Sequence, residues 1–290
     1  MHTTECVCPI LGRVTKIKPT RFSTDEWTLV QCEETGFVFL HDPPSYDAVA
    51  NEFDWHDTFV REKQMRADRE PLVSKLSQGF KQWRLNAFRN RDKMFELARR
   101  QVTEQTESLA ILDVGSGRGH RSAKFLKSFG EHGIKVIPSG IEISAKLAEM
   151  SNSQFVPFGG SVVADTAYDG MTNFPEEHFD LVVMSCYLEH EAQPLEVLQR
   201  THRVLKPGGS ILVKVPNFNS FNRFWRGDKW CGFRFPDHVN YFTPRTLQIV
   251  AESAGYSMLP QHFSDRMPTS DNMYAIFQKE RPSIRLHRAA

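Results

Sequence analysis

Three glycines at alternate positions follow an apolar run in the segment LDVGSGRGH, residues 112–120. Gly115, Gly117 and Gly119 have no side chain, so the backbone here can bend sharply and approach a ligand closely. A strand that leads into such a bend is typical of sites that bind a nucleotide or a nucleoside. These two ligands need different surroundings, because one carries phosphates and the other does not.

Two acidic residues distinguish the ligands. A dinucleotide site has the spacing G-x-G-x-x-G, whereas the third glycine here comes one residue earlier. Asp113 precedes the first glycine by two residues, where a carboxylate repels phosphate but attracts an ammonium or a sulfonium. Glu142, in the segment GIEIS, is placed to accept hydrogen bonds from two ribose hydroxyls. The expected ligand is a nucleoside with positive charge and no phosphate.

The elements that position these residues form a regular alternation from Leu109 onward. Strand-like runs read LAILDVG, KVIPSGIEI, FDLVVMS and SILVKVP, and the helix-like stretches between them read RSAKFLKSFGEHG, SAKLAEMSN and PLEVLQRTHRVL. This alternation predicts a parallel sheet flanked by helices. A further helix, PRTLQIVAESAG, precedes two more predicted strands, YSMLPQHF and NMYAIFQK.

The chain before this domain has two parts. Residues 1–58 are rich in turn-forming and aromatic residues, which predicts a small irregular β unit. Residues 59–107 contain apolar residues at helical spacing, which predicts a helical extension. Between residues 61 and 100 there are 12 Lys or Arg and 5 Asp or Glu, and we interpret this stretch as a solvated helix face. Residues 281–290 are expected to form a flexible tail.

Overall composition excludes several classes of protein. The 36 Lys and Arg balance 35 Asp and Glu, so the net charge gives no reason to expect a polyanionic partner. No apolar run is long enough to span a membrane, and the first residues lack the pattern of a signal peptide. Five cysteines do not have the spacing of a disulfide scaffold. We expect a soluble cytoplasmic protein with no membrane or nucleic-acid partner, and we leave homodimer formation open.

Taken in order, the motifs resemble those of the class I S-adenosylmethionine-dependent methyltransferases over about residues 108–280. ILDVGSGRG is similar to the first cofactor motif, GIEIS to the acidic second strand, FDLVVMSCYLEH to the fourth strand, and RVLKPGGSILVKVPN to the turn into the fifth. The resemblance implies an α/β, Rossmann-like sheet of seven strands, mostly parallel with the last antiparallel. It also implies that S-adenosyl-L-methionine lies over the carboxyl ends of these strands.

The resemblance assigns cofactor-binding roles to residues of the glycine bend and the strand ends. These residues are Asp113, Gly115, Ser116, Gly117, Gly119, Glu142, Ile143, Asp165 and Cys186. Either Ser161 or Asp165 could contact the adenine, and Asp165 is preferred. Cys186 and Tyr187 either line the pocket or pack beside it.

The segment PDHVNYFTPRTLQIVAESAGY is similar to one found in members that act on small molecules. It implies methyl transfer, at oxygen in our prediction, to a sugar, a lipid-linked compound or a natural-product intermediate. The alternative is an RNA- or protein-modifying methyltransferase that docks through residues 61–100.

The insertion 217–242 is expected to be an irregular loop that acts as an acceptor lid, because it is long and rich in aromatic residues and arginine. His238 is the first candidate for a base that takes a proton from an acceptor hydroxyl. The alternative is a histidine that fixes the loop by bonding backbone. The residues expected at the acceptor are Tyr187, His190, Trp225, Arg226, Trp230 and Phe235, with Phe233, Arg223 and Arg234 beside them.

The segments CPILG and CEETG resemble the two knuckles of an N-terminal zinc ribbon carried by some related methyltransferases. Each knuckle would read C-x-x-C-G, but Leu11 and Thr35 stand where the second cysteines would be. A closed structural zinc site needs four ligands. We therefore predict a degenerate ribbon and no metal; the alternative is a site that a distant histidine completes. The potential ligands are Cys6, Cys8 and Cys32, with His41 or His56.

Overall fold

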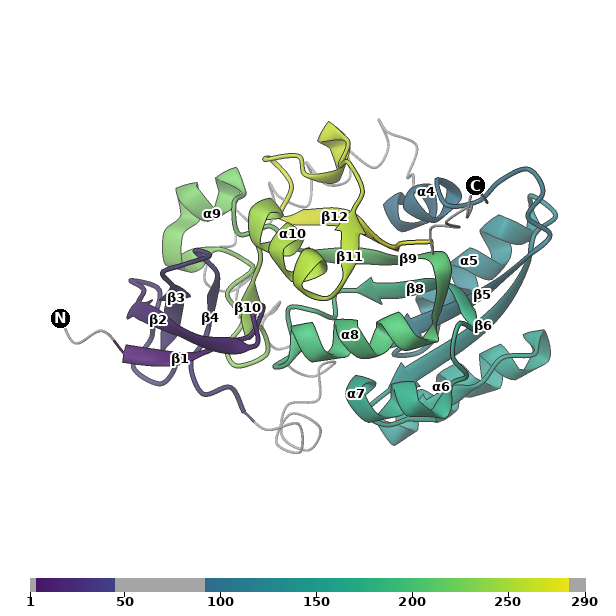
Figure 1. Ribbon diagram of the computed structural model, residues 1–290, viewed down its shortest axis with the longest axis horizontal. Coiled ribbons are helices and arrows are strands. Elements are labelled where there is room, and N and C mark those ends of the chain that lie inside the picture. The colour runs from purple at the N-terminus through teal and green to yellow at the C-terminus, as the bar shows by residue number, and fades with distance from the viewer. Residues whose placement is uncertain (1–3, 45–91, 282–290) are drawn as a thin grey trace, which may run out of the picture.

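The structure is a computed structural model, and it describes residues 4–44 and 92–281 of the chain (Figure 1). Strands in these ranges form a seven-stranded sheet and a five-stranded sheet. The smaller sheet, with β1 to β4, lies at one end of the molecule in Figure 1, and the helices α5 and α6 lie at the other.

The seven-stranded sheet has the predicted architecture. Its order is β11-β12-β9-β8-β5-β6-β7. The strands are β5 (Ser108–Val114), β6 (Lys135–Glu142), β7 (Val162–Ala164), β8 (Phe179–Ser185), β9 (Leu205–Pro216), β11 (Tyr256–Met258) and β12 (Asn272–Lys279). Strands β5 to β9 pair in parallel, and β12 is antiparallel to both of its neighbours. The predicted mostly parallel sheet with an antiparallel last strand is confirmed.

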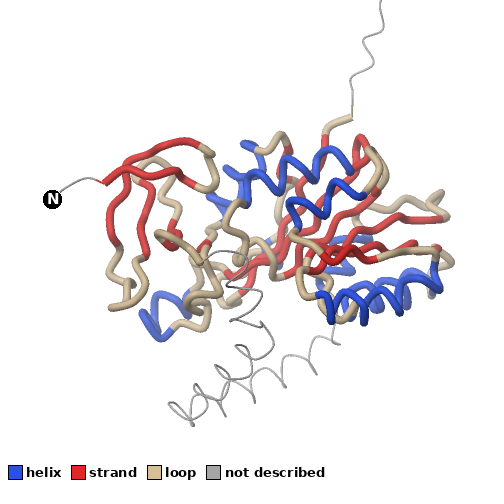
Figure 2. Tube along the Cα trace, turned by 90° about the horizontal axis from the view of Figure 1, so that it is seen from below, coloured by secondary structure: helices blue, strands red, loops and turns tan. Residues whose placement is uncertain are grey.

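Helices cover both faces of this sheet (Figure 2). Successive residues of a strand point to opposite faces, and both faces of β5 are apolar because both are covered. Leu109 and Ile111 pack with Phe125 and Phe129 on one face, whereas the alternate residues Ala110, Leu112 and Val114 face the other. The helices are α4 (Lys93–Arg99), α5 (His120–Gly130), α6 (Ala145–Phe155), α7 (Ala167–Gly170), α8 (Pro194–Val204) and α10 (Pro244–Ser253). Short 3-10 turns span Val156–Phe158, Met171–Asn173 and Phe263–Asp265.

The predicted N-terminal β unit is an antiparallel sheet that takes its last strand from the far end of the chain. Its strands, in spatial order, are β1 (Thr4–Cys8), β2 (Arg13–Pro19), β3 (Leu29–Cys32), β4 (Val38–Leu40) and β10 (Asn240–Tyr241). Strand β10 pairs with β4 through the residue pairs Asn240↔Phe39 and Tyr241↔Val38. Residues of this sheet also share a core cluster with α8 and α10, so the two sheets are packed together.

The insertion 217–242 is more ordered than predicted, and the expectation of an irregular loop was wrong. It contains α9 (Phe221–Arg226), a 3-10 turn (Gly227–Lys229) and β10. The Ser220 side chain accepts a hydrogen bond from the Arg223 amide, which starts α9. Trp230 and Tyr241 are buried against strands β3 and β4. These contacts hold the insertion on the N-terminal sheet.

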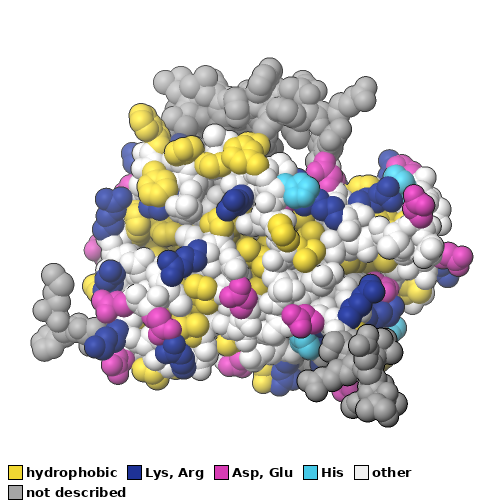
Figure 3. Space-filling model, turned by 45° about the horizontal axis from the view of Figure 1, so that its top comes forward, with side chains coloured by type: hydrophobic (Ala, Val, Ile, Leu, Met, Phe, Trp, Pro, Cys, Tyr) yellow, Lys and Arg dark blue, Asp and Glu magenta, His cyan; other side chains and the backbone are white. Residues whose placement is uncertain are grey.

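Several predictions concern residues outside the described ranges. Most of the helical extension 59–107 and of its basic stretch lies there, as do His56 and most of the tail, whereas α4 lies inside. Among the described helices, none has the length and apolar character needed to cross a bilayer. On the face shown in Figure 3, basic and acidic side chains are interspersed, which agrees with the balanced net charge.

Candidate active site

The glycine bend joins β5 to α5 at the carboxyl edge of the sheet. Gly115, Gly117 and Gly119 all have positive φ angles, of 69°, 54° and 76°. Residues with a Cβ rarely adopt this conformation, so glycine is needed at each position. Gly119 is also the N-cap residue of α5. The predicted bend is therefore formed, and its backbone amides lie at the start of a helix.

Glu142 ends the neighbouring strand β6 and holds the bend in place. Its Oε2 accepts a hydrogen bond from the Gly117 amide at 2.8 Å, and its Oε1 accepts one from the Ser144 amide at 3.0 Å. The residue is 8% exposed. Asp113 and Glu142, the two acidic residues predicted from the sequence, thus lie at the same edge of the sheet, with the Glu142 carboxylate in contact with the bend.

Asp113 lies beneath the bend in a small cavity. It is 2% exposed, and the Ser122 hydroxyl donates to its Oδ2 at 2.9 Å. Burial raises the pKa of this carboxyl to about 7, although the Ser122 hydrogen bond and the Arg121 charge oppose the shift. The cavity has a volume of about 180 Å³ and is lined by Asp113, Gly115, Ser116, His120, Arg121, Lys124 and Ser185. It therefore offers both signs of charge to a ligand.

The two candidates for the adenine lie at opposite ends of β7. Asp165 directly follows β7, and its amide bonds the Glu142 carbonyl at 3.1 Å, so it lies at the same edge as the bend. Ser161 precedes β7 and therefore lies at the opposite end of that strand. Ile143 follows Glu142 and is 39% exposed, an apolar surface beside the same edge. Position favours Asp165 over Ser161. Ser116 turns partly inward, with its hydroxyl 3.3 Å from that of Ser151.

Cys186 and Tyr187 follow β8 and approach the bend from the other side. A Cβ at Gly115 would lie only 3.1 Å from Cδ2 of Tyr187, so the tyrosine ring covers this glycine. The Tyr187 hydroxyl donates to Glu191. Cys186 has a positive φ of 59°, which is uncommon for a residue with a side chain and occurs most often at functional sites. Burial raises the pKa of its thiol.

A buried polar cluster lies next to Tyr187 and was only partly predicted. Its members are Glu189, His190 and His238, whose potential ligand atoms all lie within 4.8 Å of one another. Among the described residues, no other group of three His, Cys, Asp or Glu side chains lies close enough together to hold a metal ion. Glu189 Oε2 and His190 Nε2 are buried without a hydrogen-bond partner. Burial raises the pKa of Glu189 to about 7 and, with the Arg234 charge, lowers that of His190 to about 3.

Backbone carbonyls fix both imidazoles of this cluster. His190 Nδ1 lies 2.9 Å from the Asp237 carbonyl oxygen, and His238 Nδ1 lies 2.8 Å from that of Gly232. Each Nδ1 must carry the proton to donate to a carbonyl, which leaves Nε2 of each ring as the basic nitrogen. Arg234 Nη1 is 3.5 Å from His238 Nε2, and Arg234 Nη2 bonds Asp237 at 2.9 Å. His238 is therefore anchored to the loop backbone, as the structural alternative predicts, and its Nε2 faces Arg234.

The other residues predicted at the acceptor are scattered. Trp225 is 91% exposed on α9, whereas Trp230 is buried and donates from Nε1 to Asp271 Oδ1 at 2.8 Å. Arg226 bonds the Lys229 carbonyl, and Phe233 stacks with Phe235 inside the aromatic cluster on the N-terminal sheet. Trp225 and Trp230 do not form a shared wall. Trp225 points outward from helix α9, whereas Trp230 is buried in the core.

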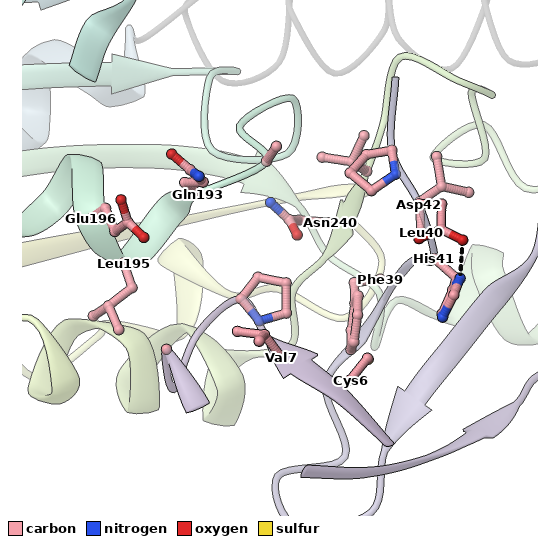
Figure 4. Close-up of a pocket in the computed structure, with 15 residues that line it drawn as sticks. Cys6, Val7, Phe39, Leu40, His41, Asp42, Gln193, Leu195, Glu196 and Asn240 are labelled. Atoms are coloured by element: carbon pink, nitrogen blue, oxygen red, sulfur yellow. Dashed lines mark ion pairs between the residues drawn. The ribbon is translucent and has the colours of Figure 1, made fainter. Parts of the chain in front are cut away.

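A larger cavity, of about 300 Å³, lies away from the glycine bend (Figure 4). Figure 4 shows Phe39 and His41 across from Gln193 and Glu196 at the start of α8. His41 is paired with Asp42 there at 2.7 Å. The residues that line it include Cys6 but none of the predicted cofactor residues. Residues of the N-terminal sheet and of the start of α8 both line it.

The three N-terminal cysteines lie near one another on β1 and β3. Burial raises the pKa of Cys8 to about 12, and its thiol neighbours Cys32. The Cys32 thiol is 3.5 Å from the Thr15 hydroxyl. Thiolates are the form that binds zinc, and burial favours the protonated thiol at Cys8, whereas hydrogen bonds with Thr15 and Thr35 outweigh burial at Cys32 and lower its pKa. The absence of zinc from this segment stays a prediction.

Sequence reasoning missed the residues of the small cavity that come from α5 and β8. His120, Arg121 and Lys124 occupy the first turns of α5, so their helical spacing after the third glycine was a usable signal. Glu189 was also missed, although an acidic residue four positions after the end of an apolar strand run is itself a signal. Arg121 is held in place by Asp92, whose two carboxylate oxygens lie 2.7 and 2.8 Å from Nη1.

Comparison with known proteins gives a consistent set of similarities. Residues 85–261 match the family described as "Methyltransferase domain". The chain is 28% identical over 150 residues to a "Ubiquinone/menaquinone biosynthesis C-methyltransferase UbiE" of Cronobacter sakazakii, covering 50% of this chain and 55% of that protein. A protein of the same name from Proteus mirabilis is 31% identical over 105 residues, with coverages of 36% and 41%. The chain thus spans about half the length of the curated relatives it matches.

One solved structure shares the fold with a TM-score of 0.50 and 16% identity. It is the complex between the Haloferax volcanii Trm112 methyltransferase activator and the putative methyltransferase, and the alignment covers 69% of this chain and 96% of that one.

Proposed function

The chain belongs to the class I S-adenosylmethionine-dependent methyltransferases, and on this premise we propose that it methylates a hydroxyl oxygen of a small organic acceptor. The observation that carries the proposal is the position of the buried cluster of Glu189, His190 and His238. It offers two unpartnered polar atoms and a fixed imidazole beside the residues that follow β8. Such groups suit an acceptor that must be oriented and must lose a proton.

The residues of the glycine bend fit the cofactor. S-adenosylmethionine is a sulfonium nucleoside whose amino-acid end carries both an ammonium and a carboxylate. Asp113 supplies negative charge in the small cavity, and Arg121 and Lys124 supply positive charge, so the cavity suits that end of the cofactor. Glu142 would hold the ribose hydroxyls and Asp165 the adenine. When bound, the cofactor supplies an electrophilic methyl group.

The chain's own contribution to the reaction is positioning and proton removal. His238 Nδ1 is fixed by the Gly232 carbonyl, so the basic Nε2 has a constant orientation toward the cluster. In our proposal, Nε2 of His238 accepts the acceptor's hydroxyl proton while Glu189 and His190 bond the acceptor's other polar groups. The Tyr187 ring packs over Gly115, and the Tyr187 carbonyl accepts a hydrogen bond from the His190 amide at 2.9 Å, so Tyr187 contacts both the bend and this cluster.

Methylation at carbon is the second candidate, favoured by the similarity to relatives that are named C-methyltransferases. A phenol or hydroquinone is nucleophilic at ring carbon after its hydroxyl loses a proton, so the same base serves both outcomes.

The proposal is tested with S-adenosylmethionine labelled in its methyl group and a panel of small phenols, hydroquinones and sugars. We expect labelled product from at least one hydroxyl-bearing acceptor, with the methyl on oxygen by NMR spectroscopy. A methyl on ring carbon would replace the first candidate with the second. Transfer confined to RNA or protein substrates, with binding that weakens steeply as salt rises, would support the macromolecular alternative instead.

We predict that cofactor affinity depends on pH through Asp113. Its pKa is about 7 in the folded chain, so below that pH the binding of a cationic ligand must displace a proton. The dissociation constant for S-adenosylmethionine should therefore rise by up to tenfold per unit as the pH falls below about 7, and flatten above it. Calorimetry in buffers of different ionisation enthalpy measures the released proton directly.

The matched control is Asp113→Asn, which keeps the size of the side chain and removes its charge. This variant should bind more weakly at pH 8 and release no proton at this step. Proton uptake on binding, or an unchanged pH dependence in the variant, would exclude Asp113 as the group that meets the cation.

A further inference from the structure

The cluster of Glu189, His190 and His238 has a second property that methyl transfer does not require. Two imidazoles and one carboxylate converge, with their potential ligand atoms within 4.8 Å of one another. This donor set is the one found in protein sites for zinc and other first-row transition metals that keep a coordination position open.

The hydrogen bonds around the two rings are those of metal-binding histidines. A histidine that ligates a metal usually donates its other ring N–H to a carbonyl or a carboxylate, which fixes the tautomer. Here His190 and His238 each direct Nδ1 at a backbone carbonyl, at 2.9 and 2.8 Å. Both Nε2 atoms are therefore the unprotonated nitrogens that can donate a lone pair.

The remaining atoms of the cluster are unsatisfied as they stand. Glu189 is 1% exposed, and its Oε2 has no hydrogen-bond partner; the same is true of His190 Nε2. Buried polar atoms are nearly always paired, since leaving one unpaired destabilises the fold. One ion would satisfy the carboxylate oxygen and the imidazole nitrogen together.

We infer that Glu189, His190 and His238 form a binding site for one divalent transition-metal ion of the zinc type. Zinc–ligand distances of about 2.0–2.2 Å require small rotations of these side chains, because ligand atoms of a tetrahedral site lie roughly 3.4 Å apart. The fourth position remains open. An ion here occupies Nε2 of His238, so metal occupancy and proton uptake by His238 exclude each other.

Arg234 is the group that opposes an ion at this place. Its Nη1 lies 3.5 Å from His238 Nε2, although Asp237 offsets its charge through a 2.9 Å ion pair. Metal binding must move this guanidinium away from the ring. The affinity for zinc should therefore rise when the positive charge of Arg234 is removed. At a metal site elsewhere in the chain, the same change should have no such effect.

The experiment is calorimetric titration of the metal-free full chain with ZnCl₂, paired with Co²⁺ absorption spectra. We expect one ion per chain and a visible spectrum of low-symmetry cobalt without the intense near-ultraviolet band of thiolate ligands. Glu189→Gln should weaken zinc binding at least tenfold, and Arg234→Gln should strengthen it. Cys8→Ser is the matched control and should bind zinc like the parent chain.

Three outcomes overturn the inference: no zinc binding by the parent chain, a thiolate band with cobalt, or binding that Cys8→Ser abolishes and Glu189→Gln leaves intact. Circular dichroism and S-adenosylmethionine binding show whether each variant is folded, because the glycine bend contains none of the three residues. The two proposals are tested separately. If the chain binds no zinc but the zinc-free enzyme transfers methyl groups, the metal site is excluded and the proposed function is retained.

Discussion

Replacing His238 with alanine should lower methyl transfer by roughly 10²–10⁴-fold while leaving the affinity for S-adenosylmethionine within about twofold. The reason is positional: His238 belongs to the insertion beside Glu189, and its Nδ1 bond to the Gly232 carbonyl aims Nε2 at the buried cluster. The proposed cofactor residues belong instead to β5, the glycine bend, β6 and the residues that follow β6, β7 and β8. Single-turnover rates with labelled cofactor measure the loss, and calorimetry measures the affinity.

His238→Asn separates a base from a structural histidine. The asparagine amide can still donate to the Gly232 carbonyl, but it cannot accept a proton. If His238 is the base, this variant should be nearly as slow as His238→Ala. A variant that regains turnover to within tenfold of the parent chain would make His238 a residue that only shapes the loop. Parallel losses of cofactor affinity and turnover in His238→Ala would lead to the same conclusion.

Glu142→Ala should weaken S-adenosylmethionine binding by about 1–3 kcal/mol, which is roughly a 5- to 150-fold rise in the dissociation constant. The change removes a charged acceptor for two ribose hydroxyls. It also removes the acceptor of the Gly117 amide at 2.8 Å, so the bend loses its support. Calorimetry with the cofactor and with its demethylated product should show equal losses, because the ribose is common to both.

Glu142→Gln is the control that divides these two effects. The glutamine carbonyl can still accept from Gly117, so the bend should keep its conformation, whereas one charged ribose contact is lost. We expect an affinity between those of the parent chain and Glu142→Ala, with an unchanged melting temperature. An unchanged affinity in Glu142→Ala would remove this residue from the cofactor site.

Local signals explain why the sheet and the bend were predictable. The buried strands β5 and β8 are almost wholly apolar, and glycine is required at 115, 117 and 119 because each has a positive φ. Such constraints act on neighbours in sequence, so they are visible in a single chain. Asp113 and Glu142 lie at the same edge because β5 and β6 pair in parallel, with Asp113 opposite Gly140.

The acceptor side was less predictable because it depends on contacts between distant segments. His238 lies beside Glu189 because the amides of the next two residues, Val239 and Asn240, both bond the Glu189 carbonyl, at 2.8 and 3.1 Å. Trp230 is an aromatic residue of the kind that lines pockets. Its indole is nevertheless buried in the core, where it donates a hydrogen bond to Asp271, 41 residues later in the chain. Aromatic content alone does not tell a buried residue from one that lines a pocket.

The strand β10 also determines the order in which the chain can finish folding. Residues 4–44 leave the ribosome long before Asn240 and Tyr241 are synthesised. Until then, the edge of β4 that later pairs with β10 has no partner strand. Contacts between residues 200 positions apart form slowly, since closing so long a loop costs entropy. An unpaired edge strand is a template for aggregation. The N-terminal segment expressed by itself should therefore be poorly soluble, and adding a separate peptide of residues 217–242 during synthesis should rescue it.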